Sequence, residues 1–355
     1  MPSKLLLTGV TGYIGGDVFY ALQKAHPELE YTLVVRSESR AKLVQEKYTE
    51  DRIKIVYTTE SASYLQVLEE EASKTDIVLH TAESADDVPS AKAISAGILK
   101  ADRTASNPIF WIHLSGTGIL QWYDAYAGRA GQPPLPREKY DDIDDIIRLI
   151  TLPMSAMHRD VDTIVLDHNH LGNHIKTAIV APCTIYGKGR GPVNTLTQQI
   201  PNLARYVFKN GFAPVVGPPG LTEWDNVHIH DVSSLFVAIV GAALDPKKSK
   251  DPELFGLKAY YFCENGKPHV WAKVAAAVAQ EAVNQGYLKE AVCKTVGPDD
   301  VTDSTLGRNS KSVASRARKY LAWDAKNGAN LEGEIEGIVK AVAEQLGVKK
   351  LQDTL

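Results

Sequence analysis

Short apolar runs alternate with longer amphipathic segments through the first half of the chain. The apolar runs are rich in β-branched residues and lack a polar face, which is typical of strands buried on both sides of a parallel sheet. They occupy residues 4–8, 31–36, 53–57, 76–80, 109–115 and 175–181. The amphipathic segments, whose apolar residues recur at helical spacing, occupy residues 15–25, 38–47, 61–73, 89–102 and 155–168. This alternation predicts an α/β fold with a doubly wound parallel sheet.

The pattern loosens after residue 181, where glycine- and proline-rich segments separate further helical stretches. The expected later helices occupy residues 195–209, 269–285, 310–320 and 331–346. A strand-like segment at 224–230 is expected to rejoin the sheet. We therefore expect residues 1–183, with 224–245 returning to them, to form the sheet domain. A smaller, mostly helical C-terminal lobe, 184–223 and 246–355, would close a crevice over it.

One long connection interrupts the rhythm of the first half. Residues 116–152 contain a proline-rich stretch at 131–137 and an acidic one at 141–145. A connection of this length inside a compact domain is usually functional or disordered. We expect it to form a lid or the rim of an active site.

Composition excludes several classes of protein. The chain has 39 Lys and Arg against 43 Asp and Glu, a net charge of −4, and no basic stretch suited to nucleic acid. Its longest apolar run, 235–244, is about half of the ~20 residues that cross a membrane. The first apolar run follows Met-Pro-Ser-Lys directly, without the regions of a signal peptide. The three cysteines form no C-x-x-C pair, so we expect no disulfide framework and no metal site, and a cytoplasmic location.

The strongest chemical signal is a glycine loop between the first strand and the first helix, with the sequence TGVTGYIG at 8–15. Glycines at this spacing permit a tight turn, the approach of a pyrophosphate to the backbone, and close packing of helix on strand. The helix N-terminus adds N–H donors for the phosphates. The loop therefore predicts dinucleotide binding. Its candidate contact residues are Gly9, Thr11, Gly12, Tyr13, Ile14 and Gly15.

The residue at the end of the second strand indicates which dinucleotide is bound. A protein that prefers NAD usually places an Asp or Glu there, to bind the ribose 2′-hydroxyl. This chain has Arg36, followed by Ser37, Ser39 and Arg40. A guanidinium with nearby hydroxyls suits a 2′-phosphate, so the pattern favours NADP(H).

These segments together resemble the extended and atypical branches of the short-chain dehydrogenase/reductase superfamily, whose fold is the Rossmann fold. The resemblance spans nearly the whole chain: the glycine loop, the fourth strand at 76–82, Ser115 at the end of WIHLSGTG, the segment 182–187 and the returning strand at 226–231. It implies that Ser115 is the active-site serine. It also implies a small-molecule substrate and a possible homodimer. The further cofactor contacts implied are His80, Thr81, Ala82, Pro182 and Thr184.

The chain departs from this family at the catalytic pair, Tyr-x-x-x-Lys on the helix after the fifth strand. Tyr20 is the one tyrosine of fifteen with a lysine four residues later, and it lies on the first crossover helix. The expected helix instead carries His158 and Asp162, four residues apart and hence on one helical face. A carboxylate beside an imidazole stabilises the protonated ring, so this pair would provide a proton donor near neutral pH. Arg159 could supply the missing positive charge near the ribose.

Other side chains remain as alternatives. Tyr123 and Tyr126 follow Ser115, and Tyr186 follows the segment expected at the nicotinamide, so each could supply the proton. His228 and His230 alternate beside an aspartate, but a third ligand is missing nearby, which favours structural histidines.

The residues favour an NADP(H)-dependent oxidoreductase of the atypical extended type that reduces a carbonyl or imine of a small organic molecule. In this interpretation Ser115 orients the reacting group and His158, polarised by Asp162, delivers the proton. Two alternatives stay open. One is a non-catalytic NADP(H)-binding redox sensor, and the other is an epimerase or dehydratase acting on nucleotide-linked sugars.

Overall fold

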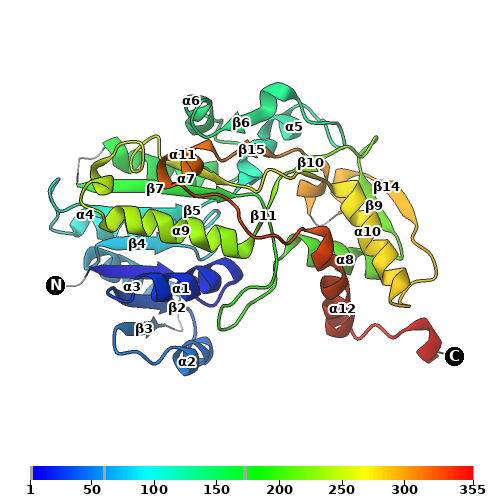
Figure 1. Cartoon of the computed structure of the whole chain (residues 1–355), viewed down its shortest axis with the longest axis horizontal. Coiled ribbons are helices and arrows are strands. Elements are labelled where there is room, and N and C mark those ends of the chain that lie inside the picture. The colour runs from blue at the N-terminus through cyan, green and yellow to red at the C-terminus, as the bar shows by residue number, and fades with distance from the viewer. Residues whose placement is uncertain (1–2, 59–60, 171–173, 302, 355) are drawn as a thin grey trace.

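A seven-stranded parallel sheet forms the centre of the molecule, in the order β12-β7-β5-β4-β1-β2-β3 (Figure 1). The computed structural model describes residues 3–58, 61–170, 174–301 and 303–354. The sheet strands are β1 (Lys4–Thr8), β2 (Glu30–Val35), β3 (Ile53–Tyr57), β4 (Ile77–His80), β5 (Ile109–Leu114), β7 (Ile175–Pro182) and β12 (Tyr260–Cys263). The predicted doubly wound α/β fold is confirmed.

Helices cover both faces of this sheet. On one face α1 (Tyr13–Ala25) packs against α9 (Ile229–Leu244), with α2 (Glu38–Lys47) near the β3 edge (Figure 1). On the other face α3 (Ser61–Ser73), α4 (Val88–Lys100) and α7 (Arg159–Asp167) pack in sequence. The strands read apolar throughout because both faces are covered.

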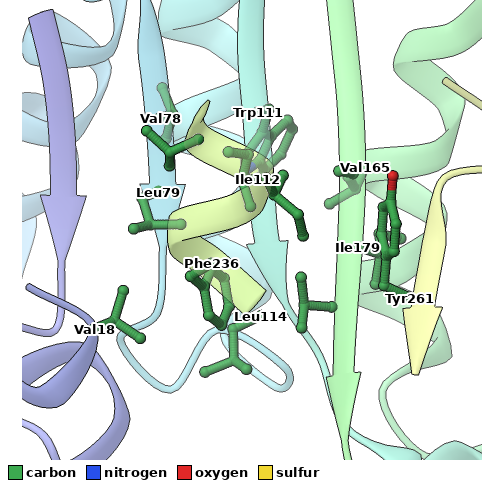
Figure 2. Packing of buried hydrophobic residues seen from close by; sticks show 14 of the residues in the cluster. Val18, Val78, Leu79, Trp111, Ile112, Leu114, Val165, Ile179, Phe236 and Tyr261 are labelled. Atoms are coloured by element: carbon green, nitrogen blue, oxygen red, sulfur yellow. The ribbon is translucent and has the colours of Figure 1, made fainter. Parts of the chain in front are cut away.

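The main hydrophobic core lies between the sheet and these helices. Every residue of β4 and β5 is buried. Figure 2 shows Val18 of α1 and Phe236 of α9 among side chains of the central strands, including Leu79 and Leu114. Full burial of one such side chain contributes about 1.5–3 kcal/mol, so this core holds the carboxyl ends of the strands in fixed positions.

A second hydrophobic core organises most of the C-terminal half. Its elements are α8 (Gln199–Asn210), β9 (Ala213–Val216), α10 (Trp271–Asn284), β14 (Cys293–Val296) and α12 (Ile335–Leu346). The helices lie within a few residues of the expected ranges. In Figure 1 this lobe stands beside the carboxyl ends of the sheet strands.

Two expectations about the second half were wrong. The segment at 224–230 does not rejoin the main sheet: β10 (Glu223–Trp224) pairs with β13 (His269–Val270), and β11 (Asn226–His228) pairs with β8 (Thr184–Tyr186). The strand that does join is β12, inside the range assigned to the second lobe, and it pairs with β7. Its run of four residues is too short to be told from a buried helical segment by pattern alone.

The long connection at 116–152 is folded over much of its length. It contains α5 (Trp122–Tyr126), β6 (Lys139–Asp141) and α6 (Ile146–Ile150). Strand β6 pairs with β15 (Lys311–Val313), which precedes α11 (Ser315–Leu321). Of this connection, only its first residues, 116–118, line the cleft described below.

Candidate active site

A cleft of about 1100 Å³ lies at the carboxyl ends of β1, β4 and β5, between the sheet and the second lobe. Open α/β sheets bind ligands at this edge, where the strand order reverses. The sheet order places that reversal between β1 and β4. The fold therefore positions the glycine loop, Ser115 and His158 around one cavity, because all of them line it.

The glycine loop has the geometry that a dinucleotide requires. Gly9 has a φ of +84°, and a Cβ there would meet Ala82 N at 2.8 Å. A Cβ on Gly15 would meet Gly9 O at 2.4 Å, whereas one on Gly12 would meet only Gly9 O, at 3.2 Å. Gly12 is also the N-cap of α1, with no side-chain cap over the helix N-terminus. Two glycines thus permit close packing, and the third leaves room for a phosphate. All six predicted loop residues line the cleft.

Charged side chains gather at the β2 end of the cleft. Arg36 and Arg40 both line it, as does Glu83 from the loop after β4. Arg36 Nη1 lies 3.1 Å from Glu83 Oε2, and both side chains are exposed. The cation expected for a 2′-phosphate is therefore present, but it faces a carboxylate in this structure.

The three residues predicted at the end of β4 have different positions. Thr81 and Ala82 line the cleft. His80 does not, because its ring points into the sheet layer, where Nδ1 lies 3.2 Å from Nδ1 of His113. Burial lowers the pKa of His80 to about 4. The fully buried side chain of His80 does not line the cleft, so the structure offers no contact of this side chain with a cofactor there.

His158 lies in the cleft beside Ser115. It is the N-cap of α7, with a left-handed φ of +68°, and its Nδ1 lies 2.7 Å from Oδ1 of Asp86. Its Nε2 faces the backbone after Ser115, because a Cβ on Gly116 would lie 3.3 Å from this atom and one on Gly118 only 2.8 Å. The two glycines of Ser-Gly-Thr-Gly therefore make room for the imidazole.

The predicted pair of His158 with Asp162 does not form. Helical spacing aligns two side chains only when both residues are helical, and His158 precedes the first residue of α7. Asp162 is fully buried, and its Oδ2 accepts a hydrogen bond of 2.8 Å from the hydroxyl of Tyr260. The carboxylate that holds His158 is Asp86, whose pKa this hydrogen bond lowers.

Three further candidates lie outside the cleft. The guanidinium of buried Arg159 donates to the carbonyl oxygens of Leu152 and Ile150, at 3.0 and 2.5 Å, so it caps the α6 segment rather than facing a ribose. Arg137 donates to the hydroxyl of Tyr123. Tyr186 donates to the carbonyl oxygen of Ala329 at 2.8 Å.

The segment from the end of β7 onward lines the cleft partly through the expected residues and partly through others. Pro182 lines it, as predicted, together with Cys183 and Ile185. Thr184 is fully buried and does not. The side chains alternate here, so the residues on either side of Thr184 face the cavity.

Sequence reasoning missed three residues around Ser115 and His158: Asp86, His113 and Tyr260. His113 and Tyr260 are polar residues inside otherwise apolar strands, and that irregularity could have singled them out. Asp86 is one of many surface carboxylates, and its sequence carries no comparable signal.

The second lobe contributes only uncharged side chains to the part of the cleft that the structure describes. They are Val193, Asn194, Thr197, Gln198, Gln199, Trp224 and Thr305. His228 and His230, the pair considered for a metal, belong to the start of α9, where His228 Nδ1 accepts from the backbone N–H of His230 at 3.1 Å. Among the described residues there is no group of three or more His, Cys, Asp or Glu side chains suited to a metal.

The order of the strands and the helices on both faces of the sheet define a Rossmann-like α/β fold with a cleft at the carboxyl ends of its strands. The chain is 31% identical to the oxidase ucsJ of an Acremonium species, over 98% of its own length and 100% of that protein. It belongs to the same family as this oxidase. No family model matches the sequence.

Solved structures of sugar-nucleotide enzymes share the fold. A dTDP-glucose 4,6-dehydratase from Bacillus anthracis, in complex with NAD, aligns over 96% of this chain and 97% of its own, with a TM-score of 0.60 and 12% identity. A UDP-glucuronic acid 4-epimerase from Bacillus cereus, in complex with UDP-glucuronic acid and NAD, aligns over 97% and 99%, with a TM-score of 0.58 and 14% identity.

The oxidase, the dehydratase and the epimerase are enzymes, and the dehydratase and the epimerase were solved in complex with NAD. A membrane-crossing helix, judged by length and apolar character, is absent from the part of the chain that the structure describes.

Proposed function

We propose that this chain is an NADP(H)-dependent oxidoreductase that reduces a carbonyl or imine of a small, uncharged organic molecule. The observation that carries the proposal is the position of His158. Its Nδ1 is held by Asp86 at 2.7 Å, its Nε2 lies beside the Gly116 and Gly118 backbone that follows Ser115, and His158, Ser115 and both glycines line the cleft.

The residues present fit the cofactor, because Gly12 begins a helix N-terminus inside the cleft that no Gly12 side chain covers. When bound, the nicotinamide would supply a hydride to the carbonyl or imine carbon and be oxidised, while the π-electron pair moves to the oxygen or nitrogen. The phosphates would be held by backbone N–H groups of the glycine loop.

His158 would complete the reduction by supplying the proton. With Nδ1–H donated to Asp86, the protonated ring has its second N–H at Nε2, directed into the cleft. This proton passes to the substrate oxygen or nitrogen, and the ring is left neutral. The Ser115 hydroxyl, at the end of β5, would hold the same atom in place. Both residues line the cleft. A proton donor must lie within hydrogen-bonding reach of the substrate, and a position on the cleft wall allows this.

The choice of NADP(H) rests on Arg36 and Arg40, which line the β2 end of the cleft. A 2′-phosphate would compete with Glu83 for the Arg36 guanidinium, since these two side chains are in contact at 3.1 Å. Because this ion pair is exposed, its own contribution is small, about 0–1 kcal/mol, and a doubly charged phosphate could displace it.

A sugar-nucleotide epimerase or dehydratase is the second candidate, because solved structures with this fold include such enzymes. A nucleoside diphosphate carries charge that a binding site usually meets with arginine or lysine. The described side chains that the second lobe directs into the cleft are all uncharged. Titration with UDP-glucose and dTDP-glucose distinguishes the two candidates, since micromolar binding of either would favour this second one.

The proposal is tested by following NADPH oxidation with three probes: 4-nitrobenzaldehyde, phenanthrenequinone and 2-methyl-1-pyrroline. We expect turnover with at least one, and its loss in His158→Ala with cofactor affinity retained. Tight NADPH binding without turnover on any probe would instead support the redox-sensor alternative.

A further inference from the structure

A row of side chains crosses the sheet directly beneath Ser115. In the strand register, His80 of β4 lies beside His113 of β5, His113 beside Ile179 of β7, and Ile179 beside Tyr260 of β12. Neighbours in register point to the same face of a parallel sheet. Three of the four side chains are polar, although the row is buried.

Asp162 of α7 reaches this row. Its Oδ2 accepts from Tyr260 at 2.8 Å, and its Oδ1 lies 3.8 Å from Nε2 of His113. Asp162, Tyr260 and His113 are each 0–1% exposed. The carboxyl is therefore packed between the sheet and α7. Burial raises its pKa, and the Ser115 hydroxyl acts in the opposite direction.

Three of the buried polar atoms that lack a hydrogen-bond partner among the described residues belong to this group. Oγ of Ser115, Oδ1 of Asp162 and Nε2 of His113 are all buried and make no hydrogen bond to the residues that the structure describes. An unpaired buried polar group costs about 1–3 kcal/mol, so such groups are rare and are concentrated at functional sites. Ser115 follows His113 by two residues, so it lies on the same side of the sheet as His113, the side that Asp162 approaches.

We propose that Asp162 is a positioning residue whose own proton sets the direction of the Ser115 hydroxyl. When Asp162 is protonated, its O–H donates to Ser115 Oγ, and the Ser115 O–H is free to donate to a carbonyl oxygen or imine nitrogen. When Asp162 is ionised, it accepts the Ser115 O–H, and Ser115 turns a lone pair toward the cleft. The inference rests on the proposed function for its catalytic meaning, but the link between the two side chains can be tested without a substrate.

The surroundings of Asp162 keep both of its forms accessible. Burial raises its pKa to about 6, while Ser115, Tyr260, His158 and Arg159 act in the opposite direction. The remaining titratable group beside it, His113, is neutral near pH 7 because burial lowers its pKa well below the ordinary value. The groups that face Asp162 from α7, β5 and β12 therefore leave it able to gain or lose a proton at physiological pH.

The two states suit opposite reactions. Reduction requires a donor to the carbonyl oxygen or imine nitrogen, which is Ser115 beside a protonated Asp162. Oxidation of an alcohol is helped by an acceptor for the hydroxyl proton, which is Ser115 beside an ionised Asp162. Raising the pH through the pKa of Asp162 should therefore lower the rate of reduction and favour oxidation.

The link is tested first by ¹³C NMR of carboxyl-labelled aspartate in the full chain, with Asp162→Asn to assign the signal. Loss of a hydroxyl donor to an ionised carboxylate raises its pKa, so Ser115→Ala and Tyr260→Phe should each move the midpoint of Asp162 upward by about one pH unit. Ser95→Ala is the matched control, since the Ser95 hydroxyl bonds to His168 at 2.8 Å on the same face of the sheet. It should not move the midpoint.

An unchanged midpoint in Ser115→Ala overturns the proposal, whether or not any substrate is known. If Asp162→Asn fails to fold, the signal is assigned as the one that moves in Tyr260→Phe, and the test with Ser115→Ala stands.

The role of Asp162 in catalysis is tested by the pH profile of kcat for whichever probe is reduced. The falling limb near the NMR midpoint should be lost in Asp162→Asn and in Ser115→Ala, with KM for NADPH unchanged. In Tyr260→Phe the limb should move to higher pH. Because loss of the His158 proton also lowers the rate, the limb is assigned to Asp162 by its shift in Tyr260→Phe. A limb that does not shift in Tyr260→Phe and persists in Asp162→Asn overturns the role of Asp162 in reduction. An absence of turnover on every probe counts against the proposed function instead. The NMR result then still tests whether Ser115 and Asp162 are hydrogen-bonded.

Discussion

Nδ1 of His158 lies 2.7 Å from Oδ1 of Asp86, so the loop after β4 holds the N-cap residue of α7. The hydrogen bond leaves Nε2 of His158 as the nitrogen that faces the cleft. It also lowers the pKa of Asp86, which keeps that carboxylate ionised near neutral pH. An ionised partner stabilises the imidazolium, which is the form of a histidine that donates a proton.

We expect His158→Ala to lower turnover by about 10²–10⁴ while NADPH binds as before, since the proton donor is lost and the glycine loop is untouched. Asp86→Asn should also slow turnover, by a smaller factor, because an amide cannot balance the imidazolium charge. Stopped-flow absorbance with the accepted probe measures both. Full activity in His158→Ala would place the proton donor elsewhere.

Cofactor preference should follow Arg36. NADPH should bind at least tenfold more tightly than NADH, a difference of about 1.4 kcal/mol, and Arg36→Ala should remove most of it. Glu83→Gln removes the carboxylate in contact with Arg36, so it should strengthen NADPH binding and leave NADH nearly unchanged. Isothermal titration calorimetry of NADPH and NADH with the unmodified protein, Arg36→Ala and Glu83→Gln measures these affinities. Equal affinities in the unmodified protein would contradict the assignment.

Two glycines of the loop should respond differently to substitution. Gly12→Val places its side chain at the helix N-terminus, where the Cβ makes one tight contact, with Gly9 O at 3.2 Å. It should block cofactor binding and preserve the fold. Gly15→Ala brings a Cβ within 2.4 Å of both Gly9 O and Thr81 Oγ1, so it should lower the thermal midpoint. Circular dichroism and NADPH titration separate the effects, and unchanged affinity in Gly12→Val would place the phosphates elsewhere.

Stability should depend on Asp17, a fully buried carboxylate of α1. It accepts bonds of 2.9 and 2.7 Å from the guanidinium of Arg190 and one of 2.5 Å from Ser233. Removal of one partner of a buried pair costs about 3–5 kcal/mol, so Asp17→Asn should lower the free energy of unfolding by that order. Glu38→Gln, which breaks an exposed pair with Lys42, should cost less than about 1 kcal/mol.

The pH dependence of this contribution has a definite sign. The pKa of folded Asp17 is lowered despite its burial, chiefly by the hydrogen bonds from Arg190 and Ser233. Its stabilisation is therefore complete above the unfolded value of about 3.9 and is lost as the pH falls through the lower folded pKa. Urea denaturation of both proteins between pH 3 and pH 7 should show the difference shrinking at the acid end.

The contribution of Asp162 to stability should change with pH in the opposite direction to that of Asp17. Burial raises its pKa to about 6, so its contribution is complete below the unfolded value of about 3.9 and is lost as the pH rises through the folded pKa. Asp162→Asn lacks this titration. The variant should gain stability relative to the unmodified protein between about pH 4 and pH 7. A constant difference across that range would show that Asp162 does not titrate there. The buried Asp142 cancels in this comparison, since it is present in both proteins.

The elements that could be predicted are those whose cause lies within a few consecutive residues. The apolar strands predict a parallel sheet because both of its faces need apolar side chains. The loop from Gly9 to Gly15 predicts a phosphate site because a strand, three glycines and a helix follow one another directly. Ser115 was placed correctly at the cleft for the same reason, since it ends a strand whose position in the sheet the pattern had already indicated.

Only the tertiary structure decided which charged and polar groups meet at that cleft. Asp86 and His158 are 72 residues apart, and Asp162 and Tyr260 are 98 apart. Local periodicity had paired His158 with Asp162, and that pairing fails because a left-handed residue starts the helix. Helical spacing constrains neighbours on one helix, whereas contacts between β4, α7 and β12 depend on how those elements pack across the sheet, which no local pattern encodes.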